Sequence, residues 1–280
     1  MNVLFTGAGT SGSWQVRGAQ LGAAMGARVV PMASVEECRR ADVIVAVKRV
    51  PSELLQNIRA SGRPWLYDIV DAYPQPACGA WGKEESLAWL RQRVAELAPS
   101  GVIWPNRRMQ QDAGKEGLVL YHHHRPRIKV NPVRERIQTV GYEGAADYIE
   151  GWCGAIDAEC HRIGARFVLN PLDLADVDVV LALRDKQHAG YPQLHWKSNV
   201  KLANAHGSGT PAICLPEDGY QETRSGAEYW ATNQAELGRA LAWLTAQSSR
   251  EEVQERFLQS TFPVEAAAKQ LLDFLCASRF

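Results

Sequence analysis

The feature that most constrains this 280-residue chain is the repeated alternation of short runs rich in valine and isoleucine with stretches of helical pattern. Buried strands of a parallel sheet are continuous apolar runs, and the helices between them carry apolar residues every three or four positions. The run 42–47 (DVIVAV) is typical of such a strand, and Leu87, Leu90, Val94 and Leu97 mark one face of a helix. Strands separated by helices predict βαβ units and therefore an α/β fold.

Both halves of the chain repeat this alternation. In the first half we expect strands at 2–6, 28–32, 42–48, 64–70, 101–105 and 118–122, and helices at 14–25, 52–60 and 84–97. In the second half we expect strands at 137–142, 166–169, 177–183, 211–215 and 228–231, and helices at 145–163, 199–206, 234–246 and 250–276. Pro263 should break the last helix, because proline interrupts the hydrogen-bond ladder.

A turn-rich stretch at 123–133 separates the two halves. It predicts two Rossmann-like domains joined by a short linker. We place the first domain at 1–128, the second at 129–262 and a final helical segment at 263–280.

The composition is that of a globular protein, with 46% hydrophobic and 22% charged residues. No apolar run approaches the ~20 residues of a membrane-spanning helix, and the N-terminal residues lack the features of a secretory signal. We therefore expect a cytoplasmic protein with no membrane span. The six cysteines form no C-x-x-C pair and no Cys/His spacing typical of zinc, so we expect no metal site.

The net charge of zero conceals an asymmetry. Residues 1–133 carry 17 Lys and Arg against 11 Asp and Glu, a net charge of +6, whereas residues 134–280 carry 14 against 20, a net charge of −6. Two interpretations stay open. The oppositely charged halves attract one another, or the basic first half meets an anionic partner.

A glycine-rich loop follows the first expected strand. Gly7, Gly9 and Gly12 fit the pattern G-x-G-x-x-G, in which the backbone approaches a pyrophosphate at a helix N-terminus. A nicotinamide dinucleotide site also needs an acidic residue at the end of the second strand, and none stands there. We therefore interpret the loop as a tight turn close to a ligand, with Gly9, Gly12 and Ser13 as candidate contacts of a nucleotide.

The segment 197–222 concentrates phosphate-binding chemistry. Lys197, Lys201 and Asn204 are spaced to share one face of a helix. Beyond a short strand, Gly219 opens a second helix whose N-terminus could hold a diphosphate against the two lysines. Glu222 could accept hydrogen bonds from ribose hydroxyls. The alternative is a solvated basic helix face beside an ordinary turn.

This segment resembles the donor-binding half of GT-B fold glycosyltransferases, in particular bacterial and phage members. The matching pattern is K-x-x-x-K-x-x-N-A, G-x-P-x-I and G-Y-x-E, carried here by Lys197, Lys201, Asn204, Ala205, Gly209, Pro211, Ile213, Gly219, Tyr220 and Glu222. The similarity is strongest over 175–275. Many retaining members have two glutamates eight residues apart where this chain has Trp196 and Asn204, so the stereochemical outcome stays open.

The resemblance implies two Rossmann-like domains that face each other across a cleft, with a C-terminal helix that crosses back to the first domain. It implies that Lys197 and Lys201 bind the donor phosphates together with the backbone amides of Gly219 and Tyr220. Glu222 would bind the ribose, and Asn204 would contact phosphate or sugar. The donor would be a nucleotide-diphospho-sugar, most simply a UDP-sugar, and no further cofactor would be required.

An inverting sugar transfer also needs a base that takes the proton of the acceptor hydroxyl. The strand expected at 64–70 leads to Asp68 and Asp71 at its carboxyl end, where α/β proteins gather their sites. Asp71 is the leading candidate and Asp68 the second, and the alternative is that both cap the next turn. His123, one of three consecutive histidines at the junction of the halves, is a third candidate. Three neighbouring histidines in an extended segment point in alternating directions, so they do not predict a metal site.

The acceptor is less constrained. Basic residues alternate with aromatic residues in the first half, which suits an anionic acceptor such as a modified base in DNA. A lipid-linked sugar, an anionic sugar and a protein stay open, as does the oligomeric state. Two other functions also stay open: an NAD(P)-dependent oxidoreductase that uses the glycine-rich loop, and a non-catalytic relative that binds a nucleotide sugar or nucleic acid.

Overall fold

The computed structural model describes residues 1–74 and 77–278, without the side chains of residues 77 and 78. The first half forms a sheet of six parallel strands in the order β2-β1-β3-β4-β5-β6. These strands are β1 (Val3–Gly7), β2 (Arg28–Val29), β3 (Val43–Val47), β4 (Trp65–Asp68), β5 (Gly101–Trp104) and β6 (Leu118–Val119). Each predicted strand of this half is present, although β2 and β6 contain only two residues.

Helices cover this sheet, and we call the sheet and its helices the first lobe. They are α1 (Gly12–Trp14), the π-helical η1 (Gln15–Gln20), α2 (Leu21–Ala24), α3 (Val35–Arg39), α4 (Ser52–Ser61), the 3-10 turn η2 (Ala77–Ala80), α5 (Lys83–Leu97) and α6 (Arg107–Ala113). The helix predicted at 14–25 is therefore three consecutive helical pieces. The sequence analysis missed α3 and α6, whose five and seven residues are too short for a clear apolar period.

The second half forms a sheet of five parallel strands in the order β11-β10-β9-β7-β8, which with its helices is the second lobe. The strands are β7 (Thr139–Tyr142), β8 (Arg166–Leu169), β9 (Val179–Ala182), β10 (Ala212–Cys214) and β11 (Tyr229–Trp230). The helices and turns are η3 (Ala146–Trp152), α7 (Cys153–Ile163), η4 (Leu174–Asp176), η5 (Lys186–His188), α8 (Tyr191–His195), α9 (Val200–Ser208), α10 (Asp218–Thr223) and α11 (Gln234–Leu244).

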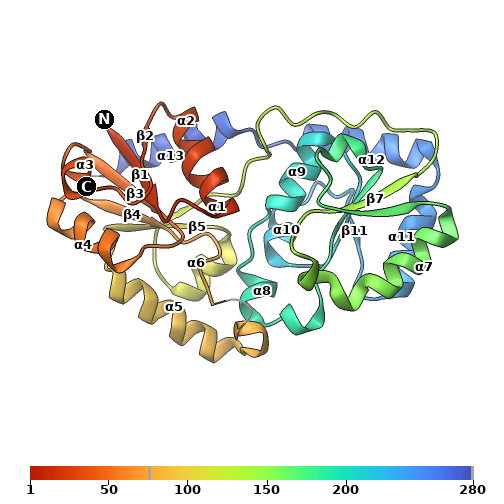
Figure 1. Ribbon diagram of the computed structural model, residues 1–280, viewed down its shortest axis with the longest axis horizontal. Coiled ribbons are helices and arrows are strands. Elements are labelled where there is room, and N and C mark those ends of the chain that lie inside the picture. Colours follow the sequence, from red (N-terminus) through yellow and green to blue (C-terminus); the bar gives the residue numbers. More distant parts are fainter. Residues whose placement is uncertain (75–76, 279–280) are drawn as a thin grey trace.

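The C-terminal segment connects the two lobes. Helix α12 (Gln247–Gln259) packs beside α9, and the chain then breaks at Pro263, as predicted, before α13 (Val264–Ala277). Helix α13 returns to the first lobe, where Ala267 and Leu271 pack in one apolar cluster with Phe5 and Leu21. Figure 1 shows α13 beside α2, on the far side of the molecule from α11. The predicted crossing back is confirmed, and residues 279 and 280 lie outside the described part.

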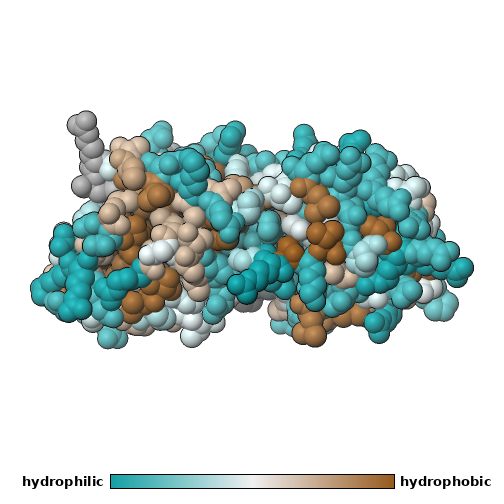
Figure 2. All heavy atoms as spheres, turned by 90° about the horizontal axis from the view of Figure 1, so that it is seen from above, coloured by the Kyte–Doolittle hydropathy of each residue, from teal (hydrophilic) through white to brown (hydrophobic). Residues whose placement is uncertain are grey.

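Seen from above, the elongated molecule narrows between its lobes, and hydrophilic residues cover much of this face (Figure 2). The linker predicted at 123–133 contains no helix or strand. The α/β class with two parallel sheets is thus confirmed, while the domain limits at 128 and 262 stay predictions. None of the helices described in residues 1–74 and 77–278 is both long enough and apolar enough to cross a membrane.

Candidate functional site

Both lobes contribute to one cavity of about 330 Å³, which we call the interlobe cavity. From the first lobe and the segment that follows β6 it is lined by Gly12, Ser13, Val16, Asp71 and His122. From the second lobe it is lined by Tyr142, Glu143, Gly144, Ala145, Tyr148, Arg184, Lys197, Ser198, Val200, Lys201 and Asn204. The cavity therefore brings together three residues predicted from the sequence, Lys197, Lys201 and Asn204, but they do not share one helix face as expected.

Lys197 does not lie on the helix with Lys201. Helix α9 begins at Val200, so Lys197 belongs to the segment before it, and the shared helix face predicted from the spacing is wrong. The Nζ atom of Lys197 donates to Asp71 Oδ2 at 2.6 Å, across the boundary between the lobes. Lys197 therefore reaches the cavity from the non-helical residues between α8 and α9.

Lys201 and Arg184 add two more basic side chains to the cavity. The Nζ atom of Lys201 lies 3.7 Å from the centre of the Tyr142 ring, and burial together with the nearby Arg184 holds the pKa of Lys201 well below its ordinary value. Arg184 forms a 2.7 Å ion pair with Glu217 and stacks its guanidinium over Tyr148. Arg184 was not predicted as a site residue, although its place directly after the predicted strand 177–183 was a usable signal.

Asp71 stands where the two lobes meet. Lys48 lies 2.6 Å from Asp71 Oδ1, while Lys197 lies 2.6 Å from Oδ2. Burial raises the pKa of Asp71, but the two ammonium groups outweigh it and hold the pKa below its ordinary value. Lys48 and Val70 both have positive φ angles, +56° and +50°, which is strained for side chains of these types. Such strain is typical of a site whose geometry the surrounding structure imposes.

Asp68, the second candidate base, is fully buried and lines none of the cavities described here. Arg17 donates to it twice, from Nε at 2.8 Å and from Nη2 at 3.2 Å, and also donates to the carbonyl of Leu120. Asp68 thus anchors a buried arginine, and the geometry gives it no access to a substrate.

Of the three histidines, the cavity is lined by His122 and not by the predicted His123. The His123 ring is buried, with its nitrogens facing the carbonyls of His124 and Val16 at 2.8 and 3.2 Å. His122 is also buried, and its Nδ1 has no hydrogen-bond partner among the described residues, nor does the hydroxyl of buried Tyr142. Buried polar atoms are seldom left unpaired, so these two atoms are free to hydrogen-bond to a molecule in the cavity.

The glycine-rich loop reaches the cavity only in part. Gly12 and Ser13 line it, and the Ser13 hydroxyl lies 3.2 Å from Lys48 Nζ. Gly9 does not line it. Its φ of +86° and the 2.7 Å that would separate an added Cβ from Pro31 explain why glycine stands there. Of the loop residues predicted to lie near a ligand, Gly12 and Ser13 therefore line the cavity and Gly9 does not.

Gly219, Tyr220 and Glu222 lie on α10, outside the lining of the interlobe cavity. The Glu222 carboxylate accepts hydrogen bonds from the backbone N–H groups of Arg107 and Arg108, at 2.8 and 2.9 Å, at the start of α6 in the other lobe. Its predicted contact with ribose would therefore compete with bonds that join the lobes.

Asn204 does line the cavity. Its side-chain oxygen accepts from the backbone N–H of Arg125 at 2.9 Å, and its amide group donates to Glu143 at 3.2 Å. Within the ranges 1–74 and 77–278, no three His, Cys, Asp or Glu side chains lie close enough together to hold a metal ion.

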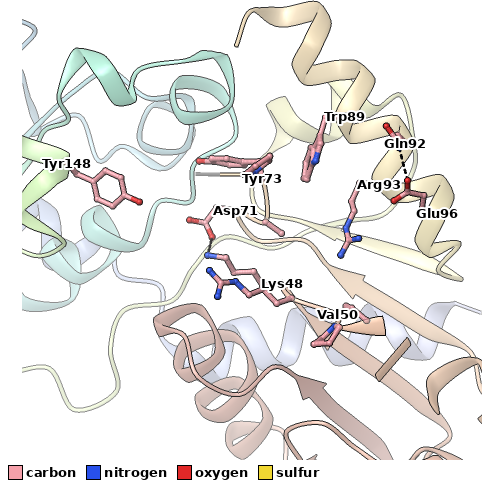
Figure 3. Close-up of a pocket in the computed structure, with 13 residues that line it drawn as sticks. Lys48, Val50, Asp71, Tyr73, Trp89, Gln92, Arg93, Glu96 and Tyr148 are labelled. Atoms are coloured by element: carbon pink, nitrogen blue, oxygen red, sulfur yellow. Dashed lines mark hydrogen bonds and ion pairs between the residues drawn. The ribbon is translucent and has the colours of Figure 1, made fainter. Parts of the chain in front are cut away.

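A second cavity of about 710 Å³ opens beside the first, and Asp71 and Tyr148 line both. It is bounded mainly by the ends of β3 and β4 and by α5, with Lys48, Arg49 and Arg93 as its cations and Tyr73, Trp89 and Tyr148 as its aromatic residues. Figure 3 shows Tyr148 facing it from the second lobe and Trp89 and Arg93 from α5. We call it the basic aromatic cavity.

No protein-family model matches the chain, and no curated protein matches it. Solved structures do resemble it over nearly its whole length. AviGT4, described as a glycosyltransferase involved in avilamycin A biosynthesis, is 14% identical with a TM-score of 0.59, and the alignment covers 99% of both chains. MurG of Acinetobacter baumannii is 10% identical with a TM-score of 0.54 and covers 99% of both chains.

The UDP-GlcNAc 2-epimerase of Neisseria meningitidis, in a structure bound to UDP-GlcNAc, is 8% identical with a TM-score of 0.55 and covers 99% of this chain and 100% of its own. At such identities the likeness shows the fold alone. The two facing parallel sheets and these full-length matches define the GT-B fold, as expected from the sequence. Its structural relatives are glycosyltransferases and an epimerase.

Proposed function

We propose that the protein transfers a sugar from a nucleoside diphosphate sugar, with UDP as the first candidate nucleotide, to the hydroxyl group of an acceptor. The observation that carries this proposal is the position of Asp71, whose carboxylate lines both cavities and bonds to a lysine from each lobe. The donor would occupy the interlobe cavity, and the acceptor would approach from the basic aromatic cavity.

The interlobe cavity has the chemistry that a departing diphosphate requires. As the bond from the sugar to the diphosphate breaks, negative charge grows on the phosphate oxygens, and fixed cations nearby stabilise it. Lys197, Lys201 and Arg184 supply the basic groups, and a bound diphosphate would favour the charged forms of the two lysines, whose pKa values burial lowers. The unpaired atoms of His122 and Tyr142 would gain partners from the donor. AviGT4 and the epimerase support this proposal through the sugar chemistry that their descriptions print.

Asp71 is the proposed base. In the structure it is held ionised by Lys48 and Lys197, which makes it a weak proton acceptor. A donor diphosphate would compete for the Lys197 ammonium, and loss of that partner would move the pKa of Asp71 back up toward its ordinary value. The carboxylate could then take the acceptor's proton while the sugar is transferred.

The other predicted contacts have less support. Gly12, Ser13 and Asn204 line the proposed donor cavity and stay candidates. Gly9, Gly219, Tyr220 and Glu222 would need the lobes or loops to rearrange, and Asp68 and His123 are buried in other contacts. A DNA acceptor and a cytoplasmic location stay predictions. The three relatives named above give the dehydrogenase alternative no support.

A thermal-shift screen with UDP, GDP, CDP, ADP and TDP tests the donor site. A ligand at 100 times its Kd stabilises the folded protein by about 2.7 kcal/mol, which is readily measured. We expect one nucleotide to raise the melting temperature and Lys201→Met to abolish that rise. Lys186→Met is the matched control, because Lys186 is exposed and lines neither cavity.

Two results would contradict the proposed donor site. Either no nucleoside diphosphate binds, or Lys201→Met binds as tightly as the unmodified protein. The non-catalytic alternative is separated by a second measurement, since it binds the nucleotide sugar but releases no nucleoside diphosphate from it.

A further inference from the structure

The basic aromatic cavity carries information about the acceptor that the proposed function does not use. Its volume of about 710 Å³ is within the range of small-molecule sites. It contacts the interlobe cavity at Asp71 and Tyr148, so a molecule inside it can present a hydroxyl group to the proposed base.

Aromatic side chains form part of its wall. Trp89 is half-buried on α5, Tyr73 follows β4, and Tyr148 faces the cavity from the second lobe (Figure 3). Rings of this kind pack against other flat rings in offset or edge-to-face arrangements. A flat aromatic acceptor can therefore stack against this wall.

Two arginines of the cavity are not neutralised. Arg93 stands four residues after Trp89, on the same face of α5, and it interacts with the hydroxyl of Tyr67. No carboxylate in the described ranges forms an ion pair with Arg93 or with the exposed Arg49. Lys48, by contrast, forms an ion pair with Asp71.

Two carboxylates line the cavity: that of Asp71, which is paired with Lys48 and Lys197, and that of Glu96. Glu96 is exposed to solvent and accepts a hydrogen bond from Gln92 at 2.7 Å. A half-buried guanidinium with no acidic partner favours an anion in the cavity over a neutral molecule.

We propose that the basic aromatic cavity binds a small acceptor that carries both a flat aromatic ring and an anionic group, the ring beside Trp89 and the anion at the Arg93 guanidinium. This rests on the proposed function, in which the acceptor's hydroxyl group reaches Asp71. It adds the chemical class of the acceptor.

A matched pair of fluorescent probes tests the proposal. 8-Anilinonaphthalene-1-sulfonate carries an aromatic system and a sulfonate, and N-phenyl-1-naphthylamine has the same rings without the charge. Both are titrated into the full chain with the donor site saturated by the nucleoside diphosphate found above. We expect the sulfonate to bind more tightly, and Arg93→Gln to weaken it about tenfold, as befits the loss of a charge-assisted hydrogen bond.

Arg91→Gln is the control, because Arg91 is an exposed arginine on the same helix and does not line this cavity. It should change neither affinity. Trp89→Leu should weaken both probes, and it keeps the test decisive if Arg93→Gln fails to fold. Equal affinity for the two probes, or no effect of Arg93→Gln or Trp89→Leu, would overturn the proposal.

Competition against the bound sulfonate separates a small acid from nucleic acid. We expect thymidine 5′-monophosphate to displace the probe about as well as a ten-nucleotide thymidylate strand does. Displacement by the strand alone would make nucleic acid the acceptor and overturn the proposal for a small molecule. Binding of the nucleoside diphosphate is measured on the same samples. If the unmodified protein does not bind it, the proposed function is refuted. If the nucleoside diphosphate binds but Arg93→Gln leaves the affinity for the sulfonate probe unchanged, only this inference is refuted.

Discussion

Replacing Asp68 with asparagine separates a structural carboxylate from a catalytic one. In the structure the Asp68 carboxylate holds the Arg17 guanidinium by two hydrogen bonds, and both side chains are essentially inaccessible to solvent. Asparagine keeps the shape but removes the negative charge. The Arg17 charge would then remain buried with only neutral acceptors, the amide oxygen of the new asparagine and the backbone carbonyls of Leu120 and Tyr121.

Removing one member of a buried ion pair costs about 3–5 kcal/mol, because the remaining charge has lost its partner. Unfolding entropy is about 2.1 cal/mol/K per residue, so for a chain of this length the melting temperature should fall by about 5–8 °C. The matched control is Asp273→Asn, which breaks the exposed pair with Lys269 and should cost at most about 0.5 kcal/mol.

The assay is thermal unfolding of both variants, together with nucleoside diphosphate binding and turnover, measured as release of nucleoside diphosphate from the nucleotide sugar. Asp68→Asn should melt early and still bind the nucleotide below its melting temperature. If it melts like the unmodified protein but loses turnover, then Asp68 acts in catalysis and the structural role argued here is refuted.

Two further predictions concern charged groups. Asp71→Asn should lower turnover about 10²–10⁴-fold while nucleotide binding is kept, and normal turnover would refute the role of base. Glu228 is buried, which raises its pKa, but hydrogen bonds from His206 and the Ser225 backbone lower it to about 2, against 4.5 for an ordinary glutamate. Its stabilisation is therefore present above pH 4.5 and lost as the pH falls to 2. The difference in melting temperature between Glu228→Gln and the unmodified protein should vanish over that range, and a constant difference would contradict it.

The fold could be predicted because its strongest local signals agree with its tertiary structure. The five residues of β3 are all buried. A continuous run of valine, isoleucine and alanine is typical of a parallel strand that is covered on both faces. Pro263 separated α12 from α13 for an equally local reason. The short helices α3 and α6 were not predicted, because they depend on their N-caps, Ser34 and Asn106, more than on a repeating apolar pattern.

The site was predicted less completely, because contacts between the lobes join segments far apart in the sequence and cannot be inferred from either segment alone. Glu222 could not be assigned to the start of α6 without knowing how the lobes meet. His122 and His123 differ only in direction, and the irregular segment around them has no period from which direction could be inferred. Lys197 was assigned to a helix that begins three residues later, at Val200.

The return of α13 to the first lobe also sets an order of events during synthesis. The apolar cluster around Phe5 and Leu21 includes Val264, Leu271 and Leu275, so the core of the first lobe is complete only after α13 has been made. The second lobe can finish its own core earlier, since its apolar cluster ends at Phe257. On the ribosome the first lobe therefore emerges first and is completed last.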